Sequence, residues 1–259
     1  MPPSSFSLIT VVRNNPQVAG AVESILSQEH HGGVESIVID GASTDGTLQA
    51  LDPYRGRIAR LVSEPDKGIY DAMNKGLRLA SGEIIGLLNA DDLYQDTRVF
   101  QRVAHAFEDP AVEACYGDLV FVRQNDPLKA VRYWRGSPPA PDAFKWGWMP
   151  AHPTLFLRRS VYDRFGLFDL QYRIAADFEF MLRVLGKHRI RTVYIPEVLV
   201  RMRTGGASNG SLRGILAANA ECRRAFRNLD LPSTPLFTPL KLARHAAQLF
   251  RRPPAAERA

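Results

Sequence analysis

Acidic residues recur near the ends of short apolar segments in the first 92 residues. These residues are Asp40, Glu64, Asp66, Asp91 and Asp92. Asp91 and Asp92 are adjacent, and carboxylates are the ligands that Mg²⁺ and Mn²⁺ prefer, ions that also bridge phosphate oxygens. The pattern therefore predicts a site that binds a phosphate-bearing substrate through a divalent cation.

Other ways of binding phosphate have no support in the sequence. It contains neither G-x-G-x-x-G nor G-x-x-x-x-G-K-[ST], which argues against dinucleotide oxidoreductases and P-loop enzymes. Residues 43–48 are similar to the D-x-D-G-T-[LV] loop of haloacid-dehalogenase-like phosphatases, but Ser43 stands where that loop has its nucleophilic Asp. A phosphatase or a nucleotidyltransferase stays as an alternative.

The acidic residues depend on an alternation of predicted strands and helices to position them. Strands are expected at 6–12, 34–40, 58–62 and 83–89, and helices at 16–28, 44–51, 69–79 and 97–107. Such alternation predicts βαβ units and a parallel sheet. Ligands of open α/β sheets lie beyond the carboxyl ends of the strands, so the acidic residues should share one edge.

The second half of the chain is less regular. Strands are expected at 112–122, 130–134, 154–157 and 190–195, and helices at 177–185, 212–226 and 240–250. A Pro- and Trp-rich stretch at 138–150 has the length and irregularity of a binding loop or lid. Trp146, Trp148 and Tyr172 would stack on a sugar or pack in the core.

Three segments, together with the end of the first strand, resemble glycosyltransferase family two. Residues 39–47, I-D-G-A-S-T-D-G-T, resemble D-[DG]-x-S-x-D-x-T, and residues 82–92, G-E-I-I-G-L-L-N-A-D-D, are similar to G-E-x-I-x-x-L-[DN]-x-D-D. Residues 64–76, E-P-D-K-G-I-Y-D-A-M-N-K-G, match a narrower subgroup that builds bacterial polysaccharides and glycolipids, lipopolysaccharide among them.

The resemblance spans roughly residues 6–208 and implies a GT-A-type α/β fold. This fold has a Rossmann-like, mostly parallel sheet flanked by helices, followed here by C-terminal helices. Its segments would be a nucleotide-sugar-binding half at 1–110, an acceptor-binding and catalytic half at 111–210, and a basic helical tail at 211–259.

The resemblance also implies a nucleotide-diphosphate sugar as donor, with UDP or dTDP favoured. The residues that would contact this donor are Thr10, Val11, Asp40, Lys67 and Asp91. Thr10 and Val11 would lie against the nucleoside, Asp91 would lie near the ribose, and Asp40 would accept a hydrogen bond from the base, as a carboxylate can from an imide N–H. Lys67 would meet donor phosphate or sugar, or be an ordinary exposed lysine.

A metal ion and a mobile loop complete the implied donor site. Asp92 would hold Mn²⁺ or Mg²⁺, which neutralises the leaving diphosphate, and His152 would complete the metal or diphosphate site unless it is simply packed. Residues 201–208 are expected to be a flexible loop in which Arg201, Arg203 and Ser208 close over the diphosphate.

Transfer with inversion needs a base that takes a proton from the acceptor hydroxyl. The resemblance places this base at a helix start, which is Asp177 here, with Ala176 where the family commonly has Glu. Glu179 is the alternative, and it lies about 200° further around the helix, so only one of the two can face the cleft. We favour Asp177 because a helix N-terminus stabilises an ionised carboxylate.

The acceptor is expected to be a glycan or a lipid-linked glycan. The sequence lacks the Q-x-x-R-W segment of the family's processive members, so the enzyme should add one sugar at a time. An overall composition of 45% hydrophobic and 23% charged residues, without a long apolar segment or signal peptide, indicates a cytoplasmic globular protein. Cys115 and Cys222 are too few for a disulfide framework.

The net charge of +6 comes from the end of the chain. Residues 213–259 hold nine basic and three acidic residues, and the rest of the chain is neutral. We expect no nucleic-acid partner. Residues 236–252 would form either a basic amphipathic helix on an anionic membrane surface, on the inner face of the cytoplasmic membrane, or an ordinary docking helix. A catalytically idle membrane-binding module is the last alternative.

Overall fold

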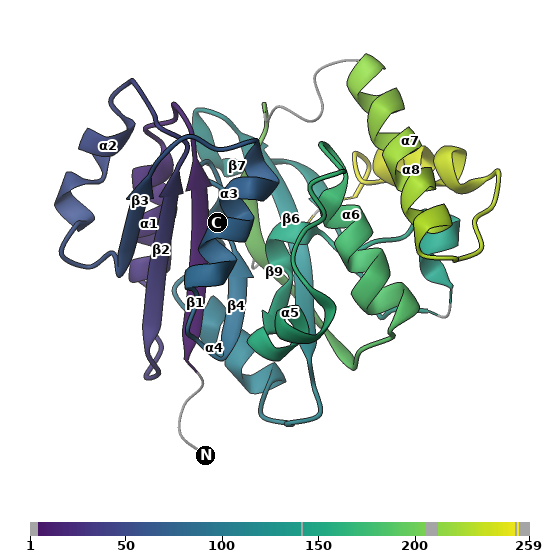
Figure 1. Ribbon diagram of the computed structural model, residues 1–259, viewed down its shortest axis with the longest axis horizontal. Helices are drawn as coiled ribbons and strands as arrows, with labels where there is room; N and C mark the ends of the chain where they lie inside the picture. Colours follow the sequence, from purple (N-terminus) through teal and green to yellow (C-terminus); the bar gives the residue numbers. More distant parts are fainter. Residues whose placement is uncertain (1–4, 141, 206–211, 252, 254–259) are drawn as a thin grey trace.

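The computed structural model describes residues 5–140, 142–205, 212–251 and 253. Within these residues, nine strands form one sheet with helices on both faces (Figure 1). The strands are β1 (Phe6–Val12), β2 (Val34–Asp40), β3 (Arg60–Ser63), β4 (Ile84–Leu87), β5 (Leu93–Tyr94), β6 (Ala114–Arg123), β7 (Asp126–Trp134), β8 (Phe156–Arg158) and β9 (Thr192–Arg203). The α/β class predicted from the sequence is confirmed.

Helices and short helical turns connect these strands. The α-helices are α1 (Val18–Leu26), α2 (Thr47–Ala50), α3 (Ile69–Leu79), α4 (Val99–Ala106), α5 (Arg159–Phe165), α6 (Ala176–Met181), α7 (Leu212–Asn228) and α8 (Phe237–Ala247). The 3-10 turns are η1 (Asp52–Tyr54), η2 (Ala143–Trp146) and η3 (His152–Thr154), and η4 (Leu182–Lys187) is a π-helical turn that continues α6.

The sheet has a parallel half and a mixed half. Its order is β3-β2-β1-β4-β8-β6-β9-β5, with β7 paired to β6. The strands β3, β2, β1 and β4 pair in parallel, whereas β8 runs antiparallel to both β4 and β6. The parallel half therefore places the loops after these four strands at one edge of the sheet.

The strand β1 shows why the central strands of the parallel half are rich in apolar residues. All seven of its residues are buried. Ile9 and Val11 pack into the cluster that contains the buried face of α3, whereas Leu8 packs into the cluster that contains residues of α1. A strand covered by helices on both faces is mostly apolar rather than alternating, and β1 is apolar at all positions except Ser7 and Thr10.

The strand β9 is longer than the sequence suggested. It extends to Arg203, so the predicted flexible loop at 201–208 is wrong for residues 201–203, and 206–211 lie outside the described residues. Pro196 lacks an N–H and normally ends a strand, which is why the prediction stopped at 195. The sheet tolerates it where the register shifts between Tyr194 and Val198.

Two short elements were not predicted, because neither has a local signal. The strand β5 has only two residues and is defined by its pairing with β9, more than 100 positions away. The helix α5 has seven residues and follows β8 directly. Elements of this length depend on tertiary contacts rather than on periodicity.

Part of the Pro- and Trp-rich stretch is core rather than an open lid. The Trp148 ring is buried against Phe144 and Tyr116, and its Nε1–H donates to Ser137 Oγ at 3.0 Å. Tyr172 is also buried, and Trp146 is 43% exposed. Of the three aromatic residues considered for sugar stacking, Trp148 and Tyr172 therefore pack in the core.

The C-terminal helices α7 and α8 dock on α6 rather than extending away from the sheet (Figure 1). Phe178 of α6, Phe226 of α7 and the fully buried Phe237 of α8 pack ring against ring. The apolar cluster that contains them also contains Ile9 and Tyr116, so it joins all three predicted segments of the chain. None of the described helices has the length and apolar content needed to cross a bilayer.

Candidate functional site

The loops after β1 and β2 are tied together at the edge of the sheet. The Asn14 N–H donates to Ser43 Oγ at 2.7 Å, and the Thr44 N–H donates to Asn14 Oδ1 at 2.9 Å. Asn14 and Ala42 both adopt positive φ angles, 49° and 56°, which allow these tight turns. The two loops therefore form one rigid edge.

Asp40 lies at the centre of this edge and is fully buried. Its Oδ2 accepts the Ser43 N–H at 3.0 Å and the Ser63 Oγ–H at 2.6 Å, and its Oδ1 accepts the Ser43 hydroxyl. A carboxylate oxygen has two lone pairs, so Oδ1 can accept one further hydrogen bond.

The loop after β3 reaches the same edge. Gly41 lies so close to Asp66 that an added Cβ would stand 2.2 Å from Asp66 Oδ2, so any side chain here would require the Asp66 carboxylate to move. Asp66 Oδ1 accepts the Gly68 N–H at 2.8 Å, which shapes the turn into α3. Lys67, one position earlier, is exposed on this turn.

Asp91 and Asp92 follow β4, and their environments differ. Asp91 is half-buried, whereas Asp92 is fully buried with its Oδ1 lacking any hydrogen-bond partner among the described residues. Burial, and then the neighbouring Asp91 charge, raise the pKa of Asp92 well above its usual value. The weak Asn89 Nδ2–H contact to Asp92 Oδ2, at 3.3 Å, lowers that pKa but does not offset burial.

These two carboxylates fit a divalent cation. The unpartnered Asp92 Oδ1 would coordinate the cation. The charge of the cation would offset both the cost of burying the Asp92 carboxylate and its repulsion from Asp91. Across the described residues, no group of three or more His, Cys, Asp or Glu side chains could form a complete cage. One or two carboxylates with substrate phosphates and water suit Mg²⁺ or Mn²⁺.

Arg203 lies beside this pair. Its Nη1–H donates to the Asp91 carbonyl oxygen and to Gln17 Oε1, both at 3.4 Å, and its positive charge lowers the pKa of Asp92. These long contacts and a buried, unpartnered Nε leave the Arg203 guanidinium loosely held. The expected place of Arg203 near a diphosphate is consistent with this geometry.

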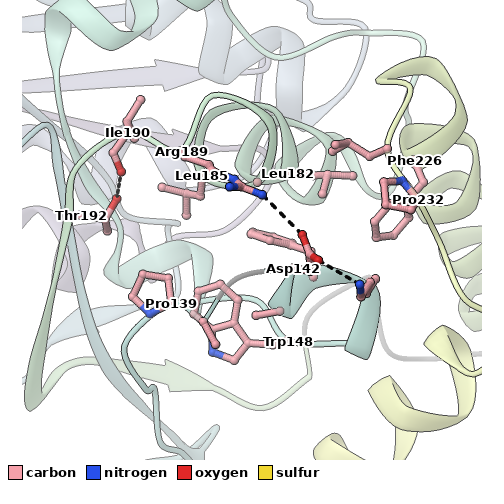
Figure 2. Close-up of a pocket in the computed structure, with 16 residues that line it drawn as sticks. Pro139, Asp142, Trp148, Leu182, Leu185, Arg189, Ile190, Thr192, Phe226 and Pro232 are labelled. Atoms are coloured by element: carbon pink, nitrogen blue, oxygen red, sulfur yellow. Dashed lines mark hydrogen bonds and ion pairs between the residues drawn. The ribbon is translucent and has the colours of Figure 1, made fainter.

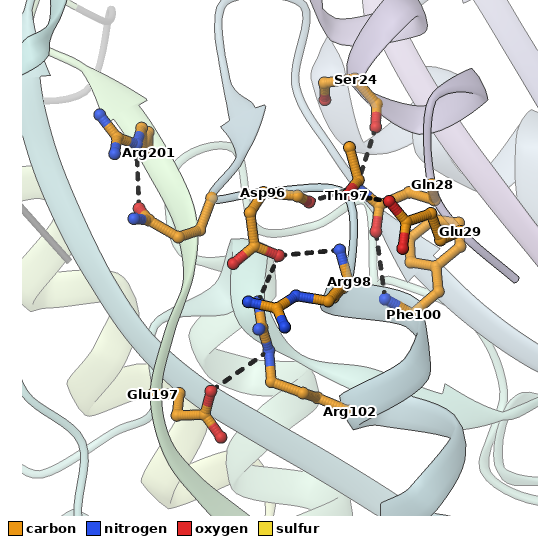
Figure 3. Close-up of polar contacts among 11 residues, drawn as sticks. Ser24, Gln28, Glu29, Asp96, Thr97, Arg98, Phe100, Arg102, Glu197 and Arg201 are labelled. Carbon is orange, nitrogen blue, oxygen red and sulfur yellow. Dashed lines mark hydrogen bonds and ion pairs between the residues drawn. The ribbon is translucent and has the colours of Figure 1, made fainter. Parts of the chain in front are cut away.

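Arg201 is not placed to close over a ligand (Figure 3). Its side chain is buried on β9, where Nε–H donates to Gln95 Oε1 at 2.9 Å and Nη1–H donates to the Pro127 carbonyl oxygen at 2.9 Å. The prediction for Arg201 is therefore corrected: it joins β9 to β5 and β7. Ser208 lies outside the described residues.

Thr10 and Val11 lie inside the sheet rather than at its edge. Thr10 is fully buried with an unpartnered Oγ1, and Val11 packs in the apolar core. Their side chains therefore do not line an open nucleoside site in this structure. Val12 and Arg13, at the end of β1, lie nearer the edge, since Val12 pairs with Asp40.

Asp177 is half-buried in the first turn of α6 and is connected to α3. The Tyr70 hydroxyl lies 3.0 Å from Asp177 Oδ1 and 2.8 Å from the Ile174 carbonyl oxygen. Burial and then the Asp177 charge raise the pKa of Tyr70, so the phenol stays protonated and can donate. Tyr70 is the second residue of α3, directly after the 64–68 turn, and its hydroxyl therefore connects Asp177 to the edge that holds the acidic residues.

Glu179 points away from this group. It is 5% exposed, and its two oxygens accept from Arg183 Nε at 3.0 Å and Arg183 Nη2 at 2.9 Å. Arg183 also donates to the carbonyl oxygens of Phe165 and Leu167. Glu179 therefore belongs to a buried ion pair that ties α6 to the loop after α5.

His152 lies near Asp177, whose charge acts on its ring. Its ring packs on Phe168 at 5.9 Å, and its Nε2 is buried without a partner among the described residues. Burial lowers the pKa of His152, although the Asp177 charge raises it, so the imidazole is neutral near pH 7. A neutral ring can ligate a metal or donate one hydrogen bond.

Two residues that organise this site were not predicted from the sequence. Tyr70 lies within residues 64–76, the segment that resembles the family subgroup, and this position is the signal that could have identified it. Ser63 ends β3 beside Asp40 and has no signal beyond its place at a strand end.

A separate cavity of about 230 Å³ lies between η2, η4 and the turn after α7 (Figure 2). Apolar side chains line it, and Asp142 at its wall pairs with Lys145 at 2.9 Å and Arg189 at 3.5 Å. It adjoins η4, whereas Asp177 lies in the first turn of the preceding helix, so the cavity is not part of the edge described above.

The chain is similar in sequence to known proteins. Residues 7–166 match the family described as Glycosyl transferase family 2. The PGL/p-HBAD biosynthesis glycosyltransferase of Mycobacterium bovis is 30% identical over 210 residues, covering 79% of each chain. The Escherichia coli protein WfaP, a UDP-Glc:alpha-D-GlcNAc-diphosphoundecaprenol beta-1,3-glucosyltransferase, is 24% identical over 203 residues and 77% of each chain.

Solved structures share the fold. S. aureus TarS 1-349 superposes with a TM-score of 0.65 at 18% identity, covering 94% of this chain and 72% of that chain. The mannosyltransferase PcManGT from Pyrobaculum calidifontis, in complex with GDP-Man and Mn²⁺, superposes with a TM-score of 0.62 at 22% identity, covering 95% of this chain and 70% of that chain. The GT-A-type fold predicted from the sequence is thereby confirmed.

Proposed function

The chain belongs to glycosyl transferase family 2, and on this premise we propose that it transfers one sugar, with inversion, from a nucleotide-diphosphate sugar to a glycan or lipid-linked acceptor. The phosphatase, nucleotidyltransferase and idle-module alternatives have no comparable support. The haloacid-dehalogenase-like segment at 43–48 instead holds Asp40 through Ser43.

One observation carries the proposal: Tyr70 connects Asp177 to the edge that holds the acidic residues. The residues Asp40, Asp91 and Asp92 follow strands of the parallel half, and Tyr70 is the second residue of the helix after the third loop of that half. A donor held by the acidic edge would thus present its sugar toward Asp177. This arrangement suits a displacement in which base and leaving group lie on opposite sides of the sugar.

Residues of the edge would bind the donor as follows. Asp40 Oδ1 accepts the imide N–H of uracil or thymine, which favours UDP or dTDP sugars. Asp91 lies near the ribose, and Lys67 and Arg203 approach the diphosphate. Thr10 and Val11 support the nucleoside from within the sheet, and WfaP, named for a UDP-Glc donor, is consistent with this choice.

Asp92, with Asp91 beside it, would hold Mn²⁺ or Mg²⁺. When bound, this ion neutralises the negative charge that develops on the departing diphosphate. The unpartnered Nε2 of His152 would complete the metal or diphosphate site. Arg203 adds a positive charge on the strand side of the diphosphate.

Asp177 would act as the base. The acceptor oxygen forms a bond to the anomeric carbon while the bond from that carbon to the diphosphate oxygen breaks, and the leaving diphosphate keeps the electron pair. Asp177 takes the hydroxyl proton from the acceptor, and the Tyr70 hydroxyl holds the carboxylate in place. General base catalysis of this kind contributes about 10²–10⁴-fold to a rate.

An anionic membrane surface, reached from the cytoplasmic side, is the proposed location of the acceptor. The helix α8 leaves apolar side chains exposed, and no acidic residue occurs between 231 and 256. WfaP is named for a diphosphoundecaprenol acceptor, which is lipid-linked. Both cysteines are buried and unpaired, as suits a reducing compartment.

A donor screen tests the proposal. Melting temperatures would be measured with UDP, dTDP, GDP and ADP, each with Mn²⁺ or with EDTA, because a ligand of the folded state raises stability by RT ln(1 + [L]/Kd). We expect UDP or dTDP to raise the melting temperature only with the metal, and Asp177→Asn to keep this shift while losing at least about 100-fold in turnover. Full turnover by Asp177→Asn would refute the assigned base, and no shift with any nucleotide would refute the donor site.

A further inference from the structure

The carboxylate of Glu221, on α7, holds the segment that leads into α6. Its Oε1 accepts the Arg173 N–H at 3.0 Å, and its Oε2 accepts the Ile174 and Ala175 N–H groups, each at 2.9 Å. Three consecutive backbone N–H groups thus converge on one side chain that is about 46 residues away in sequence. Charge-assisted hydrogen bonds of this kind are the stronger ones.

This contact fixes the backbone at the start of α6. Ala175 is the N-cap residue of α6 and makes no side-chain cap hydrogen bond. Glu221, from a different helix, accepts the N–H of Ala175 and of the two residues before it. The start of α6, and with it Asp177, is therefore fixed by α7.

Two further residues of α7 form hydrogen bonds with the same segment. Arg224 Nη2–H donates to the Gln171 carbonyl oxygen at 2.6 Å, and Asn228 Nδ2–H donates to the Tyr172 hydroxyl at 3.0 Å. Together with Glu221, they are spaced at i, i+3 and i+7, which places them on one face of the helix. One face of α7 therefore forms hydrogen bonds with both ends of the segment 171–175.

The opposite side of this segment is held by the donor half. The single proton of the Tyr70 hydroxyl is shared between two acceptors, the Ile174 carbonyl oxygen and Asp177 Oδ1. Ile174 thus has its N–H fixed by Glu221 and its carbonyl oxygen fixed by Tyr70. The position of Asp177 depends on both contacts.

We infer that Glu221 is a positioning residue for catalysis: by clamping residues 173–175 it orients Asp177 toward the acceptor. The inference rests on the proposed role of Asp177 as base. Glu221 does not touch the substrate in this assignment and acts only through the start of α6. It also lies outside residues 7–166, the part that matches the family, so α7 completes the site from beyond that region.

Two measurements on Glu221→Gln test the inference. Hydrogen exchange would be followed in peptides covering residues 171–178, and release of nucleoside diphosphate would be followed with UDP-glucose, UDP-GlcNAc, dTDP-rhamnose and GDP-mannose, with water as acceptor. We expect exchange at 173–175 to be at least about 10-fold faster, because Gln keeps one carbonyl oxygen but loses the charge and one acceptor. Turnover should fall about 10-fold, with the donor KM unchanged.

Control variants separate positioning from general damage to the fold. Arg227→Gln changes an exposed residue of the same helix and should leave both exchange and turnover unchanged. Glu221→Ala should give a larger effect than Glu221→Gln. If Glu221 acts through Asp177, adding Glu221→Gln to Asp177→Asn should not lower turnover further, whereas independent damage would multiply the two losses.

The outcomes distinguish this inference from the proposed function. Unchanged exchange at 173–175 in Glu221→Gln would overturn the clamp, whatever the turnover. A large turnover loss in Asp177→Asn but none in Glu221→Gln would overturn the positioning role and leave Asp177 as base. Faster exchange in Glu221→Gln together with full turnover in Asp177→Asn would keep the clamp and refute the base.

Discussion

Asp177 and Glu179 lie two residues apart on α6, yet their surroundings differ. Asp177 is half-buried and accepts a hydrogen bond from Tyr70, whereas Glu179 is buried with both oxygens on Arg183. A base must reach its substrate and release its proton afterward, which a carboxylate enclosed in an ion pair does poorly. The geometry therefore favours Asp177.

Substitution of Glu179 should affect stability rather than chemistry. Glu179→Ala leaves the Arg183 guanidinium buried without its carboxylate, which should cost about 3 kcal/mol of unfolding free energy. Urea unfolding would measure this loss, and turnover measured well below the melting temperature should stay within about 3-fold of the wild type. A 100-fold loss of turnover with unchanged stability would identify Glu179 as the base instead.

Asp92 should make the metal-free protein less stable as the pH rises. Burial and the Asp91 charge raise its pKa in the folded state, so folding takes up a proton. The stability due to that proton is complete below the unfolded-state pKa and is lost as the pH rises through the raised folded-state pKa. A neutral Asn at this position would not show this loss.

The test compares melting temperatures of the wild type and Asp92→Asn from about pH 4 to pH 8, in EDTA and in Mn²⁺. In EDTA the wild type should lose more stability with rising pH, so that Asn is about 2–4 °C more stable near neutrality. Mn²⁺ should stabilise only the wild type. Parallel pH curves in EDTA, or an equal response to Mn²⁺, would contradict the assignment.

At the scale of elements, β9 and the C-terminal helices differ most from what the sequence suggested. The strand β9 continues past Pro196 and places Arg201 in the sheet. Nearby, Arg102 of α4 forms ion pairs with Glu197 of β9 and with Asp96 (Figure 3). The helices α7 and α8 complete the core around α6. The region after β9 therefore contributes to the hydrophobic core as well as carrying the net positive charge.

A core substitution in α8 should destabilise the whole molecule. Phe237→Ala removes a fully buried ring that packs on Phe178 and Phe226, which should cost about 3–5 kcal/mol. Urea unfolding would measure it, with the exposed Leu242→Ala of the same helix as a control expected to lie within about 0.5 kcal/mol of the wild type. If α8 were an undocked tail, both variants would unfold like the wild type.

At the scale of the whole molecule, the C-terminal surface from α8 onward exposes both apolar and basic side chains. The exposed apolar residues include Leu242, Leu249 and Phe250, of which Phe250 is 87% exposed. Arg244 and Arg251 are exposed in the same stretch of sequence. An apolar face flanked by cations is the combination that interfacial helices present to anionic lipids.

Vesicle binding tests this surface. The protein should sediment with phosphatidylcholine vesicles that contain anionic phosphatidylglycerol, but much less with phosphatidylcholine alone, and 0.5 M NaCl should weaken the binding. A Leu249→Ser and Phe250→Ser double variant should bind at least about 10-fold more weakly, since both apolar side chains leave the bilayer. Leu79→Ser, at an exposed apolar residue of α3, is the control. Equal binding by all three proteins would exclude this surface as the contact.

The sequence alone determined the parallel half of the fold. Strands β1 and β2 match the predicted boundaries, because each is a short segment in which apolar residues predominate and do not alternate strictly with polar ones. The same property predicted the edge that carries Asp40, Asp91 and Asp92, since residues just after parallel strands must lie together. Local sequence was sufficient wherever an element or residue depends on its immediate neighbours.

Only the tertiary structure decided which residues serve that edge. Arg201 and Arg203 are two positions apart, so regular strand alternation would place both side chains on the same face, yet Arg201 bonds to Gln95 whereas Arg203 reaches the Asp91 carbonyl oxygen. Tyr70 and Glu221 meet the start of α6 across 107 and 46 positions of sequence. Contacts between distant segments leave no periodicity or motif in the chain, because they arise only when the packed core brings those segments together.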